Sequence, residues 1–284
     1  MSAASPASST TGRPVGFDQL STRDFRTICE LMRTRAGIEL SEAKRPLAQT
    51  RLTRRLRALK LTSFNQYMRL LEDPRSSEHT ELINALTTNV TAFFREAHHF
   101  ELLGRTIQQV AARSRRLRIW SAGCSSGEEP WSMAMVIRET LGAAANLDIK
   151  VLATDIDTNV LEHAREGVYV DDHVEPVSAA RRKRFFTPAA TAGSWRIADE
   201  LRDLVTFKQL NLFEPWPMKG PFDLIFCRNV IIYFNVPNKM QLLRRYHDLL
   251  APGGILCLGH SESITAGVDG FSLIGRTAYR RQAP

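Results

Sequence analysis

The sequence predicts an α/β protein in which a small all-helical N-terminal domain precedes a doubly wound, Rossmann-like sheet of mainly parallel strands. Three observations favour this fold. Residues 17–88 repeat apolar side chains at helical spacing. Beyond residue 117, short apolar runs that predict buried strands alternate with amphipathic helical segments. The first of these runs ends in a glycine-rich turn that opens a helix, which is where such sheets bind small molecules.

Length, composition and charge narrow the class of protein. The 284 residues suffice for one large or two modest domains, and contents of 43% hydrophobic and 24% charged residues are typical of soluble globular proteins. The formal net charge of +8 predicts acidic partners. The four cysteines show no metal-ligand spacing, and no signal peptide or membrane-length apolar run is evident. We therefore expect a cytoplasmic protein without metal and without direct membrane insertion.

The N-terminal region divides into a tail and a helical domain. Residues 1–16 are rich in Ser, Ala, Thr, Pro and Gly and predict a disordered tail. Residues 17–88 predict the helical domain. Its expected helices are one ending at Gly37, one from Ser41 to about Leu59, one near Ser63–Glu72 and one near Ser77–Leu86.

The second of these helices is strongly basic. Residues 43–60 contain seven Lys and Arg residues and no acidic residue. On a helix, three arginines line the face opposite three leucines: Arg51, Arg54 and Arg57 against Leu52, Leu56 and Leu59. Like charges at this spacing repel one another, so the pattern favours a surface for an acidic partner. An ordinary solvated helix face is the alternative.

A junction over residues 89–116 is predicted to join the two domains and to end in a linker helix. Phe93 can pack beneath its polar residues, whereas Arg95 stands out as a cation in a mostly uncharged stretch. His98 and His99 are neighbours and would point about 100° apart on a helix, which makes them a poor metal pair.

The turn after the first strand favours a cationic ligand without phosphate. Leu117–Met133 predicts a strand, a glycine turn and a helix. Gly123 and Gly127 have G-x-x-x-G spacing, which is neither the dinucleotide nor the P-loop motif. Glu128 and Glu129 occupy the positive end of the helix, where a phosphate would otherwise bind. S-adenosylmethionine, which carries a sulfonium and an ammonium, fits this pattern, and an acidic first turn on an ordinary βα unit is the alternative.

Later strands place polar residues at the same edge of the sheet. The strand Ile149–Asp155 ends in an acid, and acids at this position hydrogen-bond ribose hydroxyls in doubly wound folds. Asp157 is a candidate N-cap for the following helix, and further strands are expected over 204–210 and 221–230. The polar groups expected at this edge are Asp155, Asn211, Arg228, Asn229 and Tyr233.

The rest of the chain completes the sheet domain, residues 117–284. An insertion that breaks the strand–helix rhythm predicts a small antiparallel β-subdomain at about 187–203. Pro252-Gly253-Gly254 predicts a tight turn into the strand Ile255–Gly259. Residues 271–280 alternate in hydrophobicity and predict a closing antiparallel edge strand.

Six motifs, in order, resemble the CheR family of bacterial chemotaxis receptor methyltransferases. They are R-L-T-R-R-L-R-A-L, T-T-N-V-T-A-F-F-R-E-A-H-H-F, W-S-A-G-C-S-S-G-E-E-P-W-S, A-T-D-I-D, F-C-R-N-V-I-I-Y-F and L-G-H-S-E-S. Their order and spacing together are specific, and the resemblance covers about residues 18–281. It implies a receptor-docking helical domain (17–88), a junction (89–116) and a methyltransferase domain with its β-subdomain (117–284).

The resemblance implies methyl esterification of chemoreceptor glutamates by S-adenosylmethionine, with S-adenosylhomocysteine as product. Arg95 and Tyr233 would lie nearest the transferred methyl group. Glu129 would meet the methionine part of the cofactor, Asp155 its ribose, and Leu212 its adenine. The full set of implied cofactor contacts is Asn89, Thr91, Arg95, Gly123, Glu129, Asp155, Asn211, Leu212, Arg228 and Asn229. Arg51, Arg54 and Arg57 would dock the receptor, and we expect a monomer recruited to chemoreceptor arrays.

One segment departs from the family pattern. Thr187–Ala198 is short and Ala/Thr-rich for the loop with which some family members capture a receptor peptide, which argues against such a tether.

A nucleic-acid methyltransferase is disfavoured because the N-P-P-[YF] turn and interleaved aromatics are missing, so we expect no nucleic-acid partner. A non-catalytic cofactor-binding protein could lose Arg95 and Tyr233, yet both are present. Glu262 follows a strand tip and could line the pocket.

Overall fold

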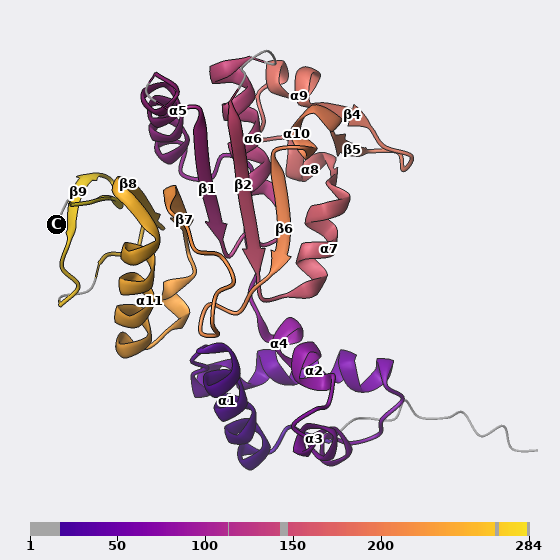
Figure 1. The fold of residues 1–284 in the computed structure, drawn as a ribbon. Coiled ribbons are helices and arrows are strands. Elements are labelled where there is room, and N and C mark those ends of the chain that lie inside the picture. Colours follow the sequence, from indigo (N-terminus) through magenta and orange to yellow (C-terminus); the bar gives the residue numbers. More distant parts are fainter. Residues whose placement is uncertain (1–17, 113, 143–146, 265–266, 283–284) are drawn as a thin grey trace, which may run out of the picture.

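A computed structural model describes residues 18–112, 114–142, 147–264 and 267–282 (Figure 1). It confirms the α/β class, with an all-helical N-terminal domain followed by a mixed sheet. The tail predicted over residues 1–16 lies outside the described residues. Among the described helices, none combines the length and apolar character needed to cross a membrane.

Over the described residues 18–88, short helices surround one apolar core that includes Phe25 and Tyr67. The side chain of Ser21 accepts a hydrogen bond from the backbone N–H of Asp24 and begins the first helix. Gly37, at φ +69°, ends that helix as predicted. The elements are α1 (Thr22–Ala36), the 3-10 helix η1 (Glu42–Lys44), α2 (Arg45–Ala58), α3 (Phe64–Glu72) and α4 (Glu78–Leu86).

The remaining described residues build a seven-stranded sheet with the order β6-β2-β1-β7-β8-β10-β9. Strands β6, β2, β1, β7 and β8 are parallel, and β10 and β9 are antiparallel. Their bounds are β1 (Arg116–Ala122), β2 (Asp148–Asp155), β6 (Val205–Gln209), β7 (Phe222–Cys227), β8 (Leu250–Leu258), β9 (Phe271–Gly275) and β10 (Ala278–Arg281). The strand order reverses between β1 and β7, and open α/β sheets bind ligands at such a switch point.

Helices cover both faces of this sheet, which confirms the doubly wound arrangement. Successive residues of β1 alternate between the faces, so Ile119 joins the core beneath α5 and α6, and Trp120 joins the core that contains Tyr246 of α11. Leu161 of α7 belongs to the same core as Ile119. The elements are α5 (His98–Ala111), α6 (Glu128–Leu141), α7 (Thr158–Glu166), α11 (Val236–Leu249) and the 3-10 helix η2 (Ile231–Tyr233).

The predicted β-subdomain is a three-stranded antiparallel sheet of order β3-β5-β4. It begins at Val168, upstream of the predicted range, because a three-residue strand is too short to show a period in the sequence. Phe93 of the junction packs edge-on against Tyr169 and Phe186 of this sheet, with ring centroids 5.0 and 5.4 Å apart. The elements are β3 (Val168–Val170), α8 (Asp171–Val174), α9 (Ala179–Phe185), β4 (Phe186–Pro188), β5 (Ser194–Ile197) and α10 (Asp199–Arg202).

Two expectations near the C-terminus differ from the structure. The Pro252–Gly254 run is not a turn before a strand but lies inside β8, which shifts register against β7 there. A Cβ on its last glycine would lie 2.8 Å from the carbonyl oxygen of Ala251, so the irregular strand needs a glycine. The single strand predicted over 271–280 is a hairpin, because the chain turns through Thr277 at φ +50°.

The helical domain lies across the end of the sheet toward which β1, β2 and β6 point (Figure 1). Two amide side chains connect the domains there. Asn211 Nδ2 donates to the carbonyl oxygen of Arg35 at 2.6 Å, and Asn84 Nδ2 donates to Thr158 Oγ1 at 2.8 Å. The N-terminal domain therefore forms a wall over the carboxyl ends of the strands.

We expect Gly37→Ala to lower the free energy of unfolding by about 1–3 kcal/mol. The new Cβ would lie 2.2 Å from the ring of Phe213 in the sheet domain. Gly253→Ala is the matched control, because Gly253 has a similar φ of +75° but nothing within 4 Å of an added Cβ. Urea unfolding measures the free energy of unfolding of both variants. Gly253→Ala reports backbone strain alone, so an equal loss of stability in the two variants would contradict the prediction.

Candidate active site

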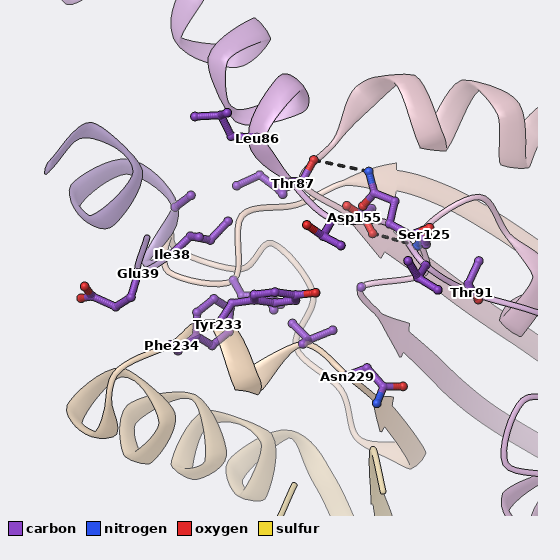
Figure 2. Close-up of a pocket in the computed structure, with 18 of the residues that line it drawn as sticks. Ile38, Glu39, Leu86, Thr87, Thr91, Ser125, Asp155, Asn229, Tyr233 and Phe234 are labelled. Carbon is purple, nitrogen blue, oxygen red and sulfur yellow. Dashed lines mark hydrogen bonds between the residues drawn. The ribbon is translucent and has the colours of Figure 1, made fainter. Parts of the chain in front are cut away.

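A cavity of about 440 Å³ opens where the carboxyl ends of the parallel strands meet the helical domain (Figure 2). The residues expected at this edge from the strand pattern, and those implied by the family resemblance, lie around the cavity together. They are Asn89, Thr91, Arg95, Gly123, Glu129, Asp155, Asn211, Leu212, Arg228, Asn229 and Tyr233. The helical domain contributes the opposite wall through residues 36–51 and 86–88, including Ile38 and Glu39. The cavity is therefore built jointly by the two domains.

The glycine turn brings its backbone close to the cavity. Gly123 has φ +88° and Ser125 has φ +50°, so the chain doubles back immediately after β1. The backbone N–H of Gly123 donates to the carbonyl oxygen of Thr154 at 2.8 Å. A Cβ at Gly123 would lie 2.4 Å from Val230 Cγ2 of the loop after β7. Glycine is thus needed for this approach of two strand ends.

Asp155 closes β2 as a buried acceptor. Its Oδ2 accepts a hydrogen bond from the backbone N–H of Ser125 at 2.8 Å, and its Oδ1 accepts one from Asp157 at 3.0 Å. Only 8% of the residue is exposed, and burial raises the pKa of the carboxyl to about 6. Each oxygen retains acceptor capacity on a residue that lines the cavity, which suits a ligand with hydroxyl groups.

Because binding is expected to use the Asp155 carboxylate as an acceptor, the affinity for S-adenosylhomocysteine should weaken as the pH falls below about 6. The loss should approach roughly tenfold per pH unit. A proton on Asp155 removes acceptor capacity from the carboxylate, whose pKa burial raises to about 6 in the free protein. Among the described cavity residues there is no histidine that would titrate in this range. Calorimetric titration from pH 5 to 8 measures the slope. Asp155→Asn lacks this titrating group, so it should bind weakly and its affinity should depend less steeply on pH than that of the wild type; parallel profiles would refute the assignment.

The two glutamates at the start of α6, Glu128 and Glu129, lie in different environments. Glu129 lines the cavity and accepts hydrogen bonds from Ser121 Oγ at 2.7 Å and from Arg228 Nη1 at 2.9 Å. Burial raises the pKa of Glu129, and the Arg228 guanidinium opposes that rise. Glu128 instead lies 3.2 Å from His173 Nδ1 and is fully buried away from the cavity. Of the two carboxylates at the start of the helix, only Glu129, which the resemblance assigned to the cofactor, lines the cavity.

Arg228 organises the junction loop as well as Glu129. Only 2% of its side chain is exposed. Its Nη2 donates to the carbonyl oxygen of Arg95 and lies 3.5 Å from Glu96 Oε2. Phe94 and Glu96 have φ values of +54° and +58°, which non-glycine residues rarely adopt. Arg228 therefore stabilises the strained loop that presents Arg95, and no pattern in the sequence indicated that Glu96 is its partner.

Glu96, His98 and His99 are the described residues whose spacing could hold a metal ion. The Nε2 atoms of both histidines instead lie 3.2 and 3.0 Å from the carbonyl oxygen of Arg276. Arg228 places its positive charge 3.5 Å from Glu96 Oε2, which opposes a second cation at this carboxylate. These contacts favour a polar network around Arg228 over a metal ion.

Arg95 and Tyr233 approach the cavity from segments of the chain that are far apart in the sequence. Arg95, in the junction, donates from Nη1 to the carbonyl oxygen of Val90 at 2.9 Å. Tyr233 ends η2, and its carbonyl oxygen accepts from the backbone N–H of Glu39 at 2.9 Å. The Tyr233 ring extends into the cavity, with its hydroxyl directed toward the side of Thr91 (Figure 2). The two side chains proposed to lie nearest the chemistry thus share one cavity.

Two of the three predicted asparagines, Asn89 and Asn211, stabilise the cavity wall by hydrogen bonds. Asn89 Nδ2 donates to Asp157 Oδ2 at 2.7 Å, and Thr87 Oγ1 donates to the same oxygen at 2.8 Å. Asn211 donates to Arg35, and its Oδ1 accepts from a backbone N–H at 3.0 Å. Asp157 also caps α7, as predicted, so one carboxylate both begins a helix and fixes the junction. The sequence did not indicate this second role.

The arginines of the basic helix do not share one environment. Arg54 and Arg57 are exposed. Arg51 is half-buried, lines the cavity, and donates from Nη1 to the carbonyl oxygens of Ala85 at 3.3 Å and Thr87 at 2.5 Å. It lies on the flank of α2 that faces α4, so it connects helices instead of standing on the exposed face that helical spacing had predicted.

Comparison with known proteins identifies the family. Residues 89–280 match the family model described as the CheR methyltransferase SAM binding domain, and residues 23–87 match the CheR methyltransferase all-alpha domain. The chain is 45% identical over 259 residues to chemotaxis protein methyltransferase 2 of Pseudomonas aeruginosa, covering 90% of this chain and 92% of that protein. It is 46% identical over 264 residues to the chemotaxis protein methyltransferase of Escherichia coli, covering 92% and 91%. The chain therefore belongs to the CheR methyltransferase family, and S-adenosylmethionine is its cofactor.

Proposed function

We propose that this protein methylates glutamate side chains of chemoreceptors, forming carboxyl methyl esters and releasing S-adenosylhomocysteine. The observation that carries the proposal is the single cavity that Asp155 and Glu129 line together with Arg95 and Tyr233. It combines acceptors for a cationic cofactor with an arginine suited to a carboxylate substrate. The names of the relatives, chemotaxis protein methyltransferases, support a chemoreceptor as the substrate.

The residues around the cavity fit S-adenosylmethionine. Asp155 at the tip of β2 would accept from the ribose hydroxyls, and the buried carboxylate of Glu129 would face the methionine part. Leu212 and Ile38 line the cavity as apolar surfaces for the adenine ring. When bound, the cofactor supplies an electrophilic methyl group on a sulfonium. The carboxylates of Asp155 and Glu129 suit this positive charge and do not suit a phosphate.

The proposed chemistry needs no general base, because a glutamate carboxylate is already ionised at pH 7. The residues of the site then act by alignment and by limiting water around the reacting charges. In this proposal Arg95 orients the incoming carboxylate or the cofactor, and Tyr233 fixes the geometry by a hydrogen bond. In such a transfer the attacking carboxylate oxygen, the methyl carbon and the sulfonium sulfur must lie in line. The main task of both side chains is therefore to hold this alignment.

The test is incubation with methyl-labelled S-adenosylmethionine and membranes that contain chemoreceptors. Label that mild base releases as methanol identifies a carboxyl ester. Membranes from a strain without chemoreceptors, and receptors whose candidate glutamates are replaced by alanine, are the controls. Label that survives base, or that appears equally in both membrane preparations, would overturn the proposed substrate.

Docking of the receptor is proposed to use the exposed arginines of α2. Arg54→Ala and Arg57→Ala should each raise the KM for receptor roughly two- to fivefold, because exposed ion pairs contribute about 0.2–1 kcal/mol. The effect should shrink at high ionic strength. Initial rates at two salt concentrations measure it, with the Kd for S-adenosylhomocysteine as the control. An unchanged KM at low salt in the double variant would exclude this docking surface.

A further inference from the structure

We propose that Glu262 is a positioning residue for methyl transfer, because its carboxylate fixes the backbone of the turn that carries Tyr233. The inference rests on the proposed role of Tyr233. Glu262 follows β8 and does not line the cavity itself, in contrast to the sequence expectation. Its influence must therefore pass through the turn after β7.

The Glu262 carboxylate accepts three backbone hydrogen bonds. Its Oε2 accepts from Gly259 at 2.6 Å and from Asn229 at 2.8 Å, and its Oε1 accepts from Ile232 at 3.1 Å. Asn229 and Ile232 bracket the turn, and Tyr233 follows directly. One side chain thus connects the ends of β7 and β8 and sets the start of η2.

The groups that contact the Glu262 carboxylate are backbone N–H donors. The residue is only 5% exposed, and none of the ion pairs among the described residues includes it. Converging backbone N–H groups act as a nest for an anion and can hold the charge without a basic partner. An amide has a single acceptor oxygen, so glutamine would set its NH2 group against one of these N–H donors.

The turn needs this restraint because its conformation is unusual. Asn229 has φ +59°, in the left-handed region that non-glycine residues rarely adopt. Gly259 makes room for it, since a Cβ there would lie 2.7 Å from the backbone nitrogen of Asn229. On the other side, the Tyr233 carbonyl accepts from Glu39 of the helical domain. Tyr233 is thus fixed between two restraints, and loss of either should displace its ring.

The experiment compares Glu262→Gln and Glu262→Asp with the wild-type enzyme. Glu262→Gln should lower kcat roughly 10- to 100-fold, because a displacement of about 1 Å can cost that much. The Kd for S-adenosylhomocysteine should rise much less than kcat falls, because Asp155 and Glu129 are untouched and only the edge of the cavity at Asn229 loosens. Glu262→Asp keeps the charge and should recover part of kcat. Asp223→Asn is the matched control: Asp223 also accepts a backbone N–H, from Arg118 at 2.8 Å, but at the opposite end of β7.

A double-mutant cycle separates positioning from general loss of structure. In the Tyr233→Phe background, Glu262→Gln should lower kcat much less than in the wild type, because the hydroxyl that it positions is gone. Fully additive losses, or equal falls in kcat for Glu262→Gln and Asp223→Asn, would overturn the proposal.

Hydrogen exchange gives a readout that does not depend on the substrate. The amides of Asn229 and Ile232 should lose protection in Glu262→Gln, whereas strand amides of β1 should not. Unchanged protection of the turn would overturn the inference even if receptor methylation is confirmed. Conversely, absence of receptor methylation by the wild type would remove the proposed function. The exchange result would still test whether the Glu262 carboxylate holds the turn.

Discussion

Arg95→Ala should lower the rate of methyl transfer by roughly 100- to 1000-fold while the protein stays folded. The guanidinium lines the cavity and donates to the Val90 carbonyl at 2.9 Å, so its head is held at the cavity edge. A fixed, bidentate cation can align a carboxylate for in-line attack, which alanine cannot do. Single-turnover rates with saturating cofactor measure this step directly.

The Arg95 prediction has an internal control. Arg95→Lys keeps the charge but loses the planar fork, so it should recover only part of the rate. Arg228 contacts the backbone carbonyl of residue 95, not its side chain, so the loop should keep its shape in both variants. The midpoint of thermal unfolding should therefore stay close to the wild-type value. Near-normal turnover of folded Arg95→Ala would remove this residue from the mechanism.

Arg228→Met should destabilise the protein by about 3–5 kcal/mol, the range found when one partner of a buried ion pair is lost. The substitution leaves Glu129 buried without its cation and removes the hydrogen bond to the Arg95 carbonyl. Glu96 also loses the positive charge that lies 3.5 Å from its Oε2. Urea unfolding at pH 7 measures the loss of stability.

The same variant should recover part of its stability in mild acid. Burial raises the pKa of Glu96, but Arg228 and His260 outweigh it and hold that pKa below its usual value in the wild type. A lowered pKa adds stability above the unfolded-state pKa, and this stability is lost as the pH falls through the folded-state pKa. Without Arg228 the pKa values of Glu96 and Glu129 rise, so their unpaired charges cost stability at pH 7 and are neutralised toward pH 5.

Glu129→Gln/Arg228→Met provides the second arm of that experiment. Without Arg228, the carboxylates of Glu129 and Glu96 lack their cation. The double variant removes the Glu129 charge, so it should be more stable than Arg228→Met alone. A deficit that is the same at pH 5 and pH 7, and that is unchanged in the double variant, would show that packing and not charge is the cause.

Much of the cavity lining was predictable because parallel strands place their carboxyl ends at one edge. Asp155, Asn211 and Arg228 are far apart in the sequence, yet each ends or closely follows a strand of the same parallel set, and Asn229 follows Arg228 directly. The glycine turn was predictable for a local reason, since positive φ at Gly123 depends on a missing side chain.

The pairing of these residues was not predictable, because it depends on how elements pack. Helical spacing could not decide which flank of α2 meets α4, and Arg51 lies on that flank. The choice between Glu128 and Glu129 depends on a rotation of α6 relative to the sheet. Glu262 acts through backbone N–H groups of a turn 30 residues away, and no sequence period reports such a contact.

The shared wall of the cavity limits how freely the two domains can be exchanged between relatives. A chimera that takes residues 18–88 from another family member would exchange the basic helix that we propose docks the receptor, and one wall of the cofactor cavity, in one step. Its cofactor affinity would then depend on seam contacts such as Asn84 with Thr158 and Asn211 with the Arg35 carbonyl. Engineered changes of receptor preference therefore belong on the outer turn of α2, around Arg54, where no cavity residue is replaced.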